Sequence, residues 1–264
     1  MKKFYKLIAL VLAIAMISCV FAACGEKEAE TDSAYVQEKG KLVVGITDFA
    51  PMDYKGDDGA WIGFDADMAA AFAKSLGVDV EFVEINWDTK EMELNDKGID
   101  CVWNGMTLTD AVKNAMETSV AYCNNAQVVV VNSDVADQYQ DVDSIASLNF
   151  VVEAGSAGAE QLDELGIEYI EAESQADALM EVAAGTSDAC VIDLLMAGAM
   201  IGEGTSYTQL TYTVSLNSEE YGVGFRKGSD LAAKLNEFLK ASYADGSMLE
   251  IAKLYGVQES LIAQ

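Results

Sequence analysis

Apolar segments of strand length alternate with segments of helical periodicity along most of this chain, and this alternation restricts the fold more than any other feature. Residues 41–47 (KLVVGIT) form a largely apolar run, residues 63–77 (GFDADMAAAFAKSLG) repeat apolar side chains at helical spacing, and residues 78–85 (VDVEFVEI) alternate with a period of two. Further strands are predicted at 99–105, 126–134, 149–155, 167–172 and 188–194. Strands alternating with helices favour parallel sheets covered on both faces, so the sequence predicts an α/β fold.

Two extended segments, far apart in the sequence, indicate how the chain is divided. Residues 126–133 (AQVVVVNS) and 218–229 (SEEYGVGFRKGS) are both extended, and the chain between them holds enough strands and helices for a sheet of its own. We therefore predict two α/β lobes joined by two crossing hinge strands. Lobe 1 comprises 41–130 and 218–264, and lobe 2 comprises 131–217.

The N-terminus has the layout of an export signal. A basic start is followed by an apolar run and by small residues before Cys24, which favours cleavage there over retention as an uncleaved membrane helix. The stretch Phe21-Ala22-Ala23-Cys24 resembles a bacterial lipobox, with Cys19 as a weaker candidate. We predict a signal peptide over 1–23, lipidation of Cys24 and a flexible tether over 24–40, anchoring the protein to the outer face of the cell membrane.

Composition excludes several classes of function. Without residues 1–23, 13 basic and 44 acidic side chains remain, and so negative a surface repels nucleic acid and anionic lipids. We interpret this charge as a solubility device. The absence of histidine excludes His-dependent triads, His metal sites and imidazole bases. Cys101, Cys123 and Cys190 are too few, and odd in number, for a disulfide framework, and Cys101 and Cys190 lie in apolar runs typical of core cysteines.

Six motifs, in their order and spacing, resemble the polar amino-acid family of extracellular solute-binding proteins of ABC importers (bacterial solute-binding protein family 3, lipoprotein type). They are GFDADMAAAFAKSLG, INWDTKEMELNDKGIDCVWNGMTLT, AYCNNAQVVVV, VVEAGSAG, SDACVIDLLMAG and YGVGFRKGSDL. The resemblance implies a two-lobed periplasmic-binding-protein-like fold that closes over an amino acid or related amine in its cleft. It also implies a monomer that delivers this ligand to membrane permease subunits, without catalysis, cofactor or metal.

A cleft that holds a free amino acid must pair its ammonium with an anion and its carboxylate with a cation or amide donors. By the resemblance, Asp193 at the end of the strand ACVID binds the ammonium, although its position alone also fits a helix N-cap. Ser156 and Ala157 lie in a turn that resembles the family's carboxylate-binding loop at a helix N-terminus. The same turn would also suit a plain helix start.

The resemblance also assigns ligand contacts in the first lobe. These positions are Phe49, Trp87, Trp103, Asn104, Gly105 and Thr107. Asn104, Gly105 and Thr107 align with positions that touch the ammonium and carboxylate, whereas the aromatic residues would pack on the ligand side chain. All three aromatic residues would also suit the core, Trp103 most of all.

Val112 departs from the family pattern, in which an arginine at this position forks onto the ligand carboxylate. The one arginine of the chain, Arg226, lies where the family commonly has a basic residue near the surface. A register shift would instead make Lys113 the anchor. Three explanations remain: the helix N-terminus, Thr107 and backbone donors hold the carboxylate; the ligand has no free carboxylate and binds through cation–π attraction; or binding has been lost.

Two other classes of function are weighed against a binding protein. The same two-lobed fold also hosts dehydratases that act on small carboxylates, and in a chain without histidine a glutamate such as Glu153 would have to serve as the acid or base. A ligand-sensing domain that signals to a partner is the other alternative. We favour a binding protein that is not an enzyme.

Overall fold

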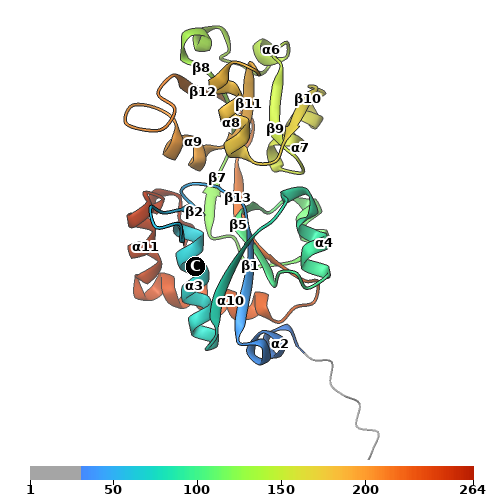
Figure 1. Ribbon diagram of the computed structural model, residues 1–264, viewed down its shortest axis with the longest axis vertical. Helices are drawn as coiled ribbons and strands as arrows, with labels where there is room; N and C mark the ends of the chain where they lie inside the picture. Colours follow the sequence, from blue (N-terminus) through green and yellow to red (C-terminus); the bar gives the residue numbers. More distant parts are fainter. Residues whose placement is uncertain (1–30) are drawn as a thin grey trace, which may run out of the picture. The chain divides into compact units, whose positions relative to one another are not determined.

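The computed structural model describes residues 31–264, in which two lobes are each built on one sheet (Figure 1). The first sheet has the order β4–β1–β5–β13–β6, with β7 also paired to β13, and the second has the order β10–β9–β11–β8–β12. The strands of the first sheet are β1 (Lys41–Ile46), β4 (Asp79–Glu84), β5 (Cys101–Thr107), β6 (Glu117–Thr118), β7 (Cys123–Asn125) and β13 (Glu219–Phe225). Those of the second are β8 (Gln127–Asn132), β9 (Phe150–Glu153), β10 (Tyr169–Ala172), β11 (Ala189–Asp193) and β12 (Leu210–Ser215).

Helices lie along both sheets (Figure 1). The first lobe contains α2 (Asp32–Lys39), α3 (Phe64–Leu76), α4 (Lys90–Asn95), α5 (Asp110–Ala115), α10 (Leu231–Asp245) and α11 (Ser247–Tyr255), with a short hairpin of β2 (Tyr54–Lys55) and β3 (Trp61–Ile62). The second contains α6 (Val142–Ile145), α7 (Ala157–Leu165), α8 (Gln175–Ala184) and α9 (Leu194–Met200). The 3-10 turns are η1 (Trp87–Thr89), η2 (Ser133–Gln138) and η3 (Gln258–Ser260).

The predicted α/β class is confirmed, but the prediction of parallel sheets is only partly correct. Strand β1 runs parallel to β4 and β5, and β9 runs parallel to β10 and β11. In contrast, β13 is antiparallel to β5, and β8 is antiparallel to β11. Each sheet is mixed because one strand next to a crossing between the lobes runs against its parallel neighbours.

The chain crosses between the sheets twice, and the two crossings lie side by side. It passes from β7 to β8 through Ala126 and returns from β12 to β13 through residues 216–218. The N–H of Leu216 donates to the carbonyl of Gln127 at 2.8 Å, and the N–H of Gln127 donates to Asn217 Oδ1 at 2.7 Å. Strand β8 belongs to the second sheet over its whole length. These hydrogen bonds join the two crossings where the lobes meet.

Both faces of each sheet are buried, as the apolar runs require. In β1, Leu42 and Val44 pack in the cluster that contains α3, whereas Val43 faces a second cluster with Leu94. In β9, Val152 packs on the α7 side. Cys101, Cys123 and Cys190 are free and buried, which confirms the predicted core positions of Cys101 and Cys190.

The N-terminal predictions fall largely outside the described residues. The signal peptide over 1–23, Cys19 and the lipidation site Cys24 all lie there. Among residues 31–264, no helix has the length and apolar character needed to cross a membrane. The predicted tether over 24–40 does not extend to residue 40, because Asp32–Lys39 forms helix α2 and the Val36 side chain is fully buried.

Arg226 is buried rather than near the surface, so that expectation is wrong. Its guanidinium donates to Asp32 at 3.0 Å, to Asp100 at 3.3 Å and to the carbonyls of Leu94 and Ile99. Five donors in a fixed fork suit this convergence of carboxylates and carbonyls, which joins α2, α4 and β13.

Candidate functional site

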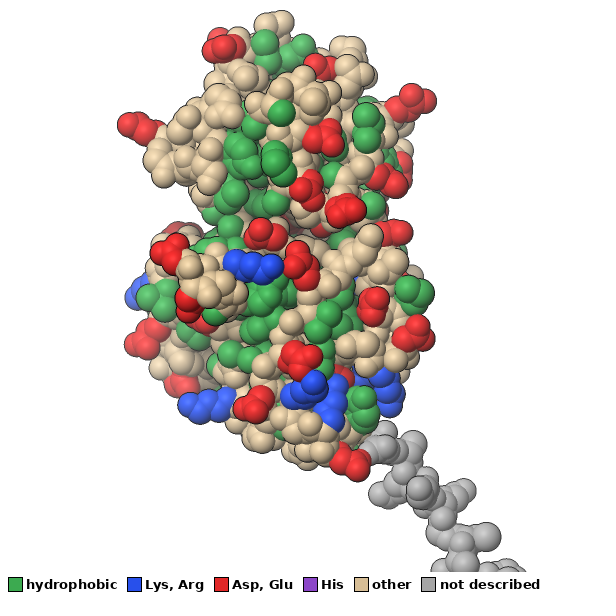
Figure 2. Space-filling model, viewed as in Figure 1, with side chains coloured by type: hydrophobic (Ala, Val, Ile, Leu, Met, Phe, Trp, Pro, Cys, Tyr) green, Lys and Arg blue, Asp and Glu red, His purple; other side chains and the backbone are tan. Residues whose placement is uncertain are grey.

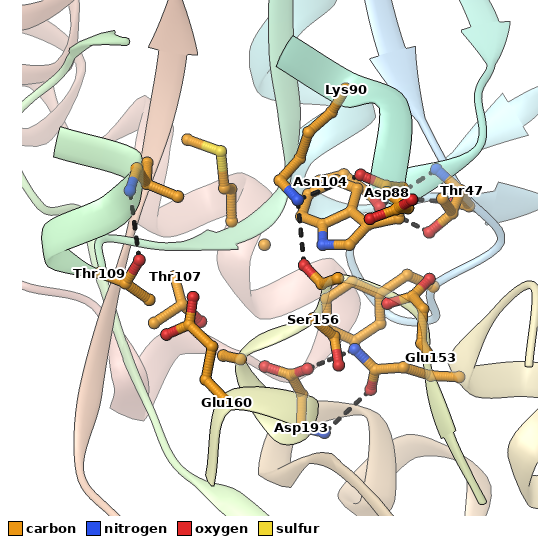
Figure 3. Close-up of a pocket in the computed structure, with 18 of the residues that line it drawn as sticks. Thr47, Asp88, Lys90, Asn104, Thr107, Thr109, Glu153, Ser156, Glu160 and Asp193 are labelled. Carbon is orange, nitrogen blue, oxygen red and sulfur yellow. Dashed lines mark hydrogen bonds between the residues drawn. The ribbon is translucent and has the colours of Figure 1, made fainter. Parts of the chain in front are cut away.

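A cavity of about 200 Å³ is lined by residues of both lobes (Figure 3). The first lobe contributes the segment after β1, the turn η1 with the start of α4, and parts of β5 and α5. The second contributes the carboxyl ends of β9 and β11 and the starts of α7 and α8. Ligand sites in α/β folds lie outside the carboxyl ends of parallel strands, and this cavity has that position.

Eight of the nine ligand-binding residues predicted from the sequence line the cavity. They are Phe49, Trp87, Asn104, Gly105, Thr107, Ser156, Ala157 and Asp193. Trp103 is the exception, since its side chain is 1% exposed and packs against Phe72 and Tyr122 in the core. The core position of the Trp103 side chain, rather than its place in the sequence, removes it from the cavity wall.

The polar residues of β5 have their hydrogen bonds taken up within the protein. Asn104 donates to the carbonyl of Thr47 at 3.1 Å and to Asp53 Oδ2 at 2.8 Å, and it accepts from the Thr47 hydroxyl at 2.7 Å. The Gly105 N–H donates to Asp65. The Thr107 hydroxyl donates to Glu219 Oε1 at 2.9 Å. Asn104 and Thr107 therefore shape the wall, and neither has a spare proton for a ligand carboxylate.

Gly105 allows an aromatic ring to lie against β5. Its φ is +54°, and a Cβ at this position would lie 2.3 Å from Phe49 Cε1. Phe49 also meets Tyr221 edge to face, with ring centroids 6.3 Å apart. These contacts fix Phe49 as an apolar part of the cavity wall. Trp87, which is 7% exposed, is a second aromatic residue in that wall.

Asp193 presents a buried carboxylate held by three side chains. It accepts hydrogen bonds from Asn125 Nδ2, Gln175 Nε2 and the Tyr221 hydroxyl, and only 4% of the residue is exposed. Asp193 does occupy the N-cap position of α9, as the alternative interpretation had it, but its side chain makes no capping hydrogen bond to that helix. Burial, reinforced by the charge of Glu219, raises the pKa of Asp193 to about 7. These three donors orient the carboxylate in the cavity wall.

The N-terminus of α7 also faces the cavity. Ser156 is its N-cap, with its hydroxyl accepting from the Ala159 N–H at 3.2 Å, and Gly155 and Ala157 line the cavity beside it. The partial positive charge of a helix N-terminus attracts anions. This geometry agrees with both interpretations of the turn, as a helix start and as a place for a carboxylate.

Lys90 reaches across the cleft from α4 to the second lobe (Figure 3). Its ammonium donates to the carbonyl of Trp87 at 3.1 Å and to the carbonyl of Gly155 at 3.0 Å, and it lies 4.8 Å from the centre of the Trp87 ring. Burial lowers the pKa of Lys90, while the charge of Glu153 opposes that shift. Within the part of the chain that the structure describes, Lys90 is the one basic side chain lining the cavity.

Glu153 ends β9 beside Asp193, and its carboxyl group is nearly unsolvated. The residue is 3% exposed, and Oε1 has no hydrogen-bond partner among the described residues. Burial, together with the negative charge of Asp193, raises the pKa of Glu153 to about 8, while the charge of Lys90 and a hydrogen bond from Gln175 oppose that rise. A buried carboxyl oxygen without a partner is costly, which singles out Glu153 in this cavity.

Val112 occupies the wall where the family pattern has arginine. It lines the cavity from α5, is 7% exposed and packs in a cluster with Met106 and Met116. Lys113 is exposed and does not line this cavity. The cavity therefore has no guanidinium.

Several lining residues were not predicted as ligand contacts. They are Thr47, Asp88, Lys90, Glu91, Met106, Thr109, Ala111, Gly155, Glu160 and Gln175, together with Val112 and Glu153, which were discussed in other roles. The acid that ends the apolar strand 150–153 was a usable signal for Glu153. Lys90 carried none, because a lysine in a polar helical segment is ordinarily exposed.

Known proteins with similar sequences and structures are solute receptors. Residues 42–258 match the family model of bacterial extracellular solute-binding proteins, family 3. The arginine-binding extracellular protein ArtP of Bacillus subtilis (strain 168) is 28% identical over 251 residues, covering 92% of this chain and 95% of ArtP. The P235GK mutant of ArgBP from T. maritima superposes with a TM-score of 0.80 at 28% identity, covering 85% of this chain and 99% of that one.

One similar structure is connected by name with an enzyme. The ancestral amino acid-binding protein AncCDT-1, a precursor of cyclohexadienyl dehydratase, is 28% identical with a TM-score of 0.77, covering 84% of this chain and 98% of that chain. The family match extends over most of the chain and includes every cavity-lining residue. The chain belongs to family 3 of the bacterial extracellular solute-binding proteins.

Proposed function

We propose that the protein captures an amino acid or a related small amine-containing solute in the cleft between its lobes and delivers it to the permease subunits of an ABC importer. It acts as a monomer held at the outer face of the cell membrane by a lipid on Cys24. The solute contacts the eight predicted residues that line the cavity, of which Asn104, Gly105 and Thr107 shape the wall and Asp193 provides the charge. Closure of the lobes removes the solute from water, which strengthens each polar contact with it.

The observation that carries this proposal is the Asp193 carboxylate. Its lone pairs are oriented by Asn125, Gln175 and Tyr221, and among the described residues no basic side chain forms an ion pair with it. A buried carboxylate without a cation is a costly arrangement that an incoming ammonium would relieve. A ligand carboxylate would meet the N-terminus of α7 and the Lys90 ammonium, the nearby positive groups left once arginine is replaced by Val112.

A thermal-shift screen tests this proposal without assuming an activity, because a ligand that binds the folded state raises the melting temperature. The chain from residue 25 onward is screened against the twenty amino acids, their decarboxylated amines and their α-amides. We expect one of these classes to raise the melting temperature in a saturable way. No shift with any compound would overturn the proposal.

A dehydratase acting on small carboxylates is the second candidate. Glu153 favours it, since a carboxyl group with a pKa near 8 suits a general acid, and AncCDT-1 supports the connection. The cavity charge opposes it, since the acids Asp88, Glu91, Glu153, Glu160 and Asp193 face one lysine and would repel an anionic substrate. Turnover of a cyclic hydroxy-carboxylate, followed by NMR and lost in Glu153→Gln, would favour the enzyme over the binding protein.

A further inference from the structure

The second lobe is acidic without any compensating base. From residue 127 to residue 215 the sequence contains 16 acidic residues and no lysine, arginine or histidine. Figure 2 shows acidic side chains scattered over both lobes on the face in view, with the basic ones on the first lobe. Any cation that meets Glu153 or Asp193 must therefore come from the first lobe or from the ligand.

The first lobe brings the charge of Lys90 near Glu153, but Lys90 forms no ion pair with that residue. Among the described residues, Lys90 is the one lysine in the lining, and its ammonium donates to the carbonyls of Trp87 and Gly155. The ion pairs of residues 31–264 include none that contains Lys90 or Glu153. Glu153 is thus buried and part of the cavity lining, it forms no ion pair among the described residues, and its Oε1 has no hydrogen-bond partner there; together these conditions point to a missing cationic partner.

Glu153 and Asp193 are also placed to act on one ligand. They end the neighbouring parallel strands β9 and β11, in which Val152 is paired with Val191. Figure 3 shows both side chains at the same cavity. The lining also includes the apolar side chains of Phe49, Trp87 and Val112 from the first lobe. That wall suits an alkyl chain between two polar ends.

We propose that Glu153 binds a second cationic group of the ligand, so that the cleft selects solutes with one ammonium for Asp193 and another ammonium or a guanidinium for Glu153. This inference rests on the proposed function and narrows its ligand class from amines in general to dications. A hydrogen bond between a cation and a buried carboxylate is worth roughly tenfold to a hundredfold in affinity. A ligand whose side chain has the same shape but no charge would leave Glu153 without a cationic partner.

Matched pairs of ligands test the inference on the unaltered protein. Calorimetric titration compares 1,5-diaminopentane with pentylamine, lysine with norleucine, and arginine with citrulline. The first member of each pair carries two cationic groups. The second member has a similar chain but lacks the positive charge at the distal end. We expect at least one dication to bind about tenfold or more tightly than its partner. Equal affinities within every pair would overturn the inference.

The Glu153→Gln variant tests the residue itself. It keeps the shape of the side chain and removes the charge, so the dication should lose its advantage while its monocationic partner changes little. Glu171→Gln is the control, because Glu171 is exposed on the neighbouring strand β10 and does not line the cavity. A variant that folds, as judged by its melting curve, and still prefers the dication would overturn the role of Glu153.

The outcomes separate this inference from the proposed function. If neutral amino acids bind as tightly as basic ones, solute capture stands and the dication inference fails. If no amino acid, amine or diamine binds, both fail. If Glu153→Gln does not fold, the matched pairs on the unaltered protein still decide the ligand class.

Discussion

Asp193 and Glu153 share the cavity but differ in the partners that the protein gives them. Asp193 accepts three hydrogen bonds from side chains on three different elements, whereas Glu153 Oε1 accepts none among the described residues. The fold therefore fixes the position of Asp193 before a ligand arrives, and it leaves Glu153 dependent on one. This difference suits a site in which Asp193 binds the group common to all ligands and Glu153 selects among them.

Replacing Asp193 tests its role as the ammonium site. Asp193→Ala should abolish ligand-induced stabilisation, because the ammonium loses its one fixed counter-charge, while the protein remains folded. Melting curves with and without ligand measure this effect. Glu203→Ala, an exposed acid in the same lobe, serves as the control and should respond like the parent. An equal ligand-induced shift in Asp193→Ala and the parent would remove Asp193 from the site.

The raised carboxyl pKa values predict how stability depends on pH. The pKa of Glu153 rises from 4.5 to about 8 in the folded state, and the groups facing it are Asp193, Lys90, Gln175 and Asp177. Between these two values the folded state keeps a proton that the unfolded state releases, so the free energy of unfolding falls as pH rises. The limit is about 1.4 kcal/mol per pH unit for each such group.

Denaturation of the ligand-free protein between pH 5 and pH 8 measures this dependence. Glu153→Gln should give a flatter curve than the parent, because glutamine has no proton to release, and Glu171→Gln should keep the parent's slope. Superimposable pH dependence in the parent and Glu153→Gln would show that Glu153 titrates normally.

Lys90 connects α4 of the first lobe directly to the turn before α7 of the second lobe. Its ammonium binds the Gly155 carbonyl, and a Cβ on Gly155 would lie 2.9 Å from Asp88 Oδ1, so the two segments are closely packed. Helix α4 and the α7 turn belong to different lobes, and this contact therefore favours the closed arrangement.

Replacing Lys90 by methionine tests this connection, since it keeps the alkyl chain and removes the ammonium. We expect a larger radius of gyration in small-angle scattering for ligand-free Lys90→Met, because fewer molecules are closed. Lys113→Met, an exposed lysine outside the cavity, should match the parent. Identical radii for Lys90→Met and the parent would mean that this contact does not control closure.

Local patterns predicted the elements better than the contacts between them. The run at 99–105 predicted a strand, and β5 covers Cys101–Thr107, but Trp103 packs in the core although it was assigned to the ligand. Residues 87–95 form the 3-10 turn η1 followed by the short helix α4, and Lys90 at the start of α4 is buried. Its partner Gly155 lies 65 positions away, a contact that no local pattern encodes.

At the level of the complete protein, charge and family membership lead to one account. The chain belongs to a family of extracellular receptors, and its second lobe contributes only negative charge to the cleft. The sequence was sufficient for the two lobes, for the family and for eight lining residues, because these depend on periodicity and motif order. The sequence could not predict that Glu153 lacks an ion pair, because this depends on which lysine side chain reaches the cavity in the folded protein.

The most direct test is a crystal structure of the protein with the tightest ligand found in the screen. The account predicts that the ligand occupies the cavity between the lobes, with one nitrogen within hydrogen-bond distance of Asp193 and a second cationic nitrogen within the same distance of Glu153. A ligand bound outside this cavity, or one whose nitrogen atoms avoid Asp193, would contradict it.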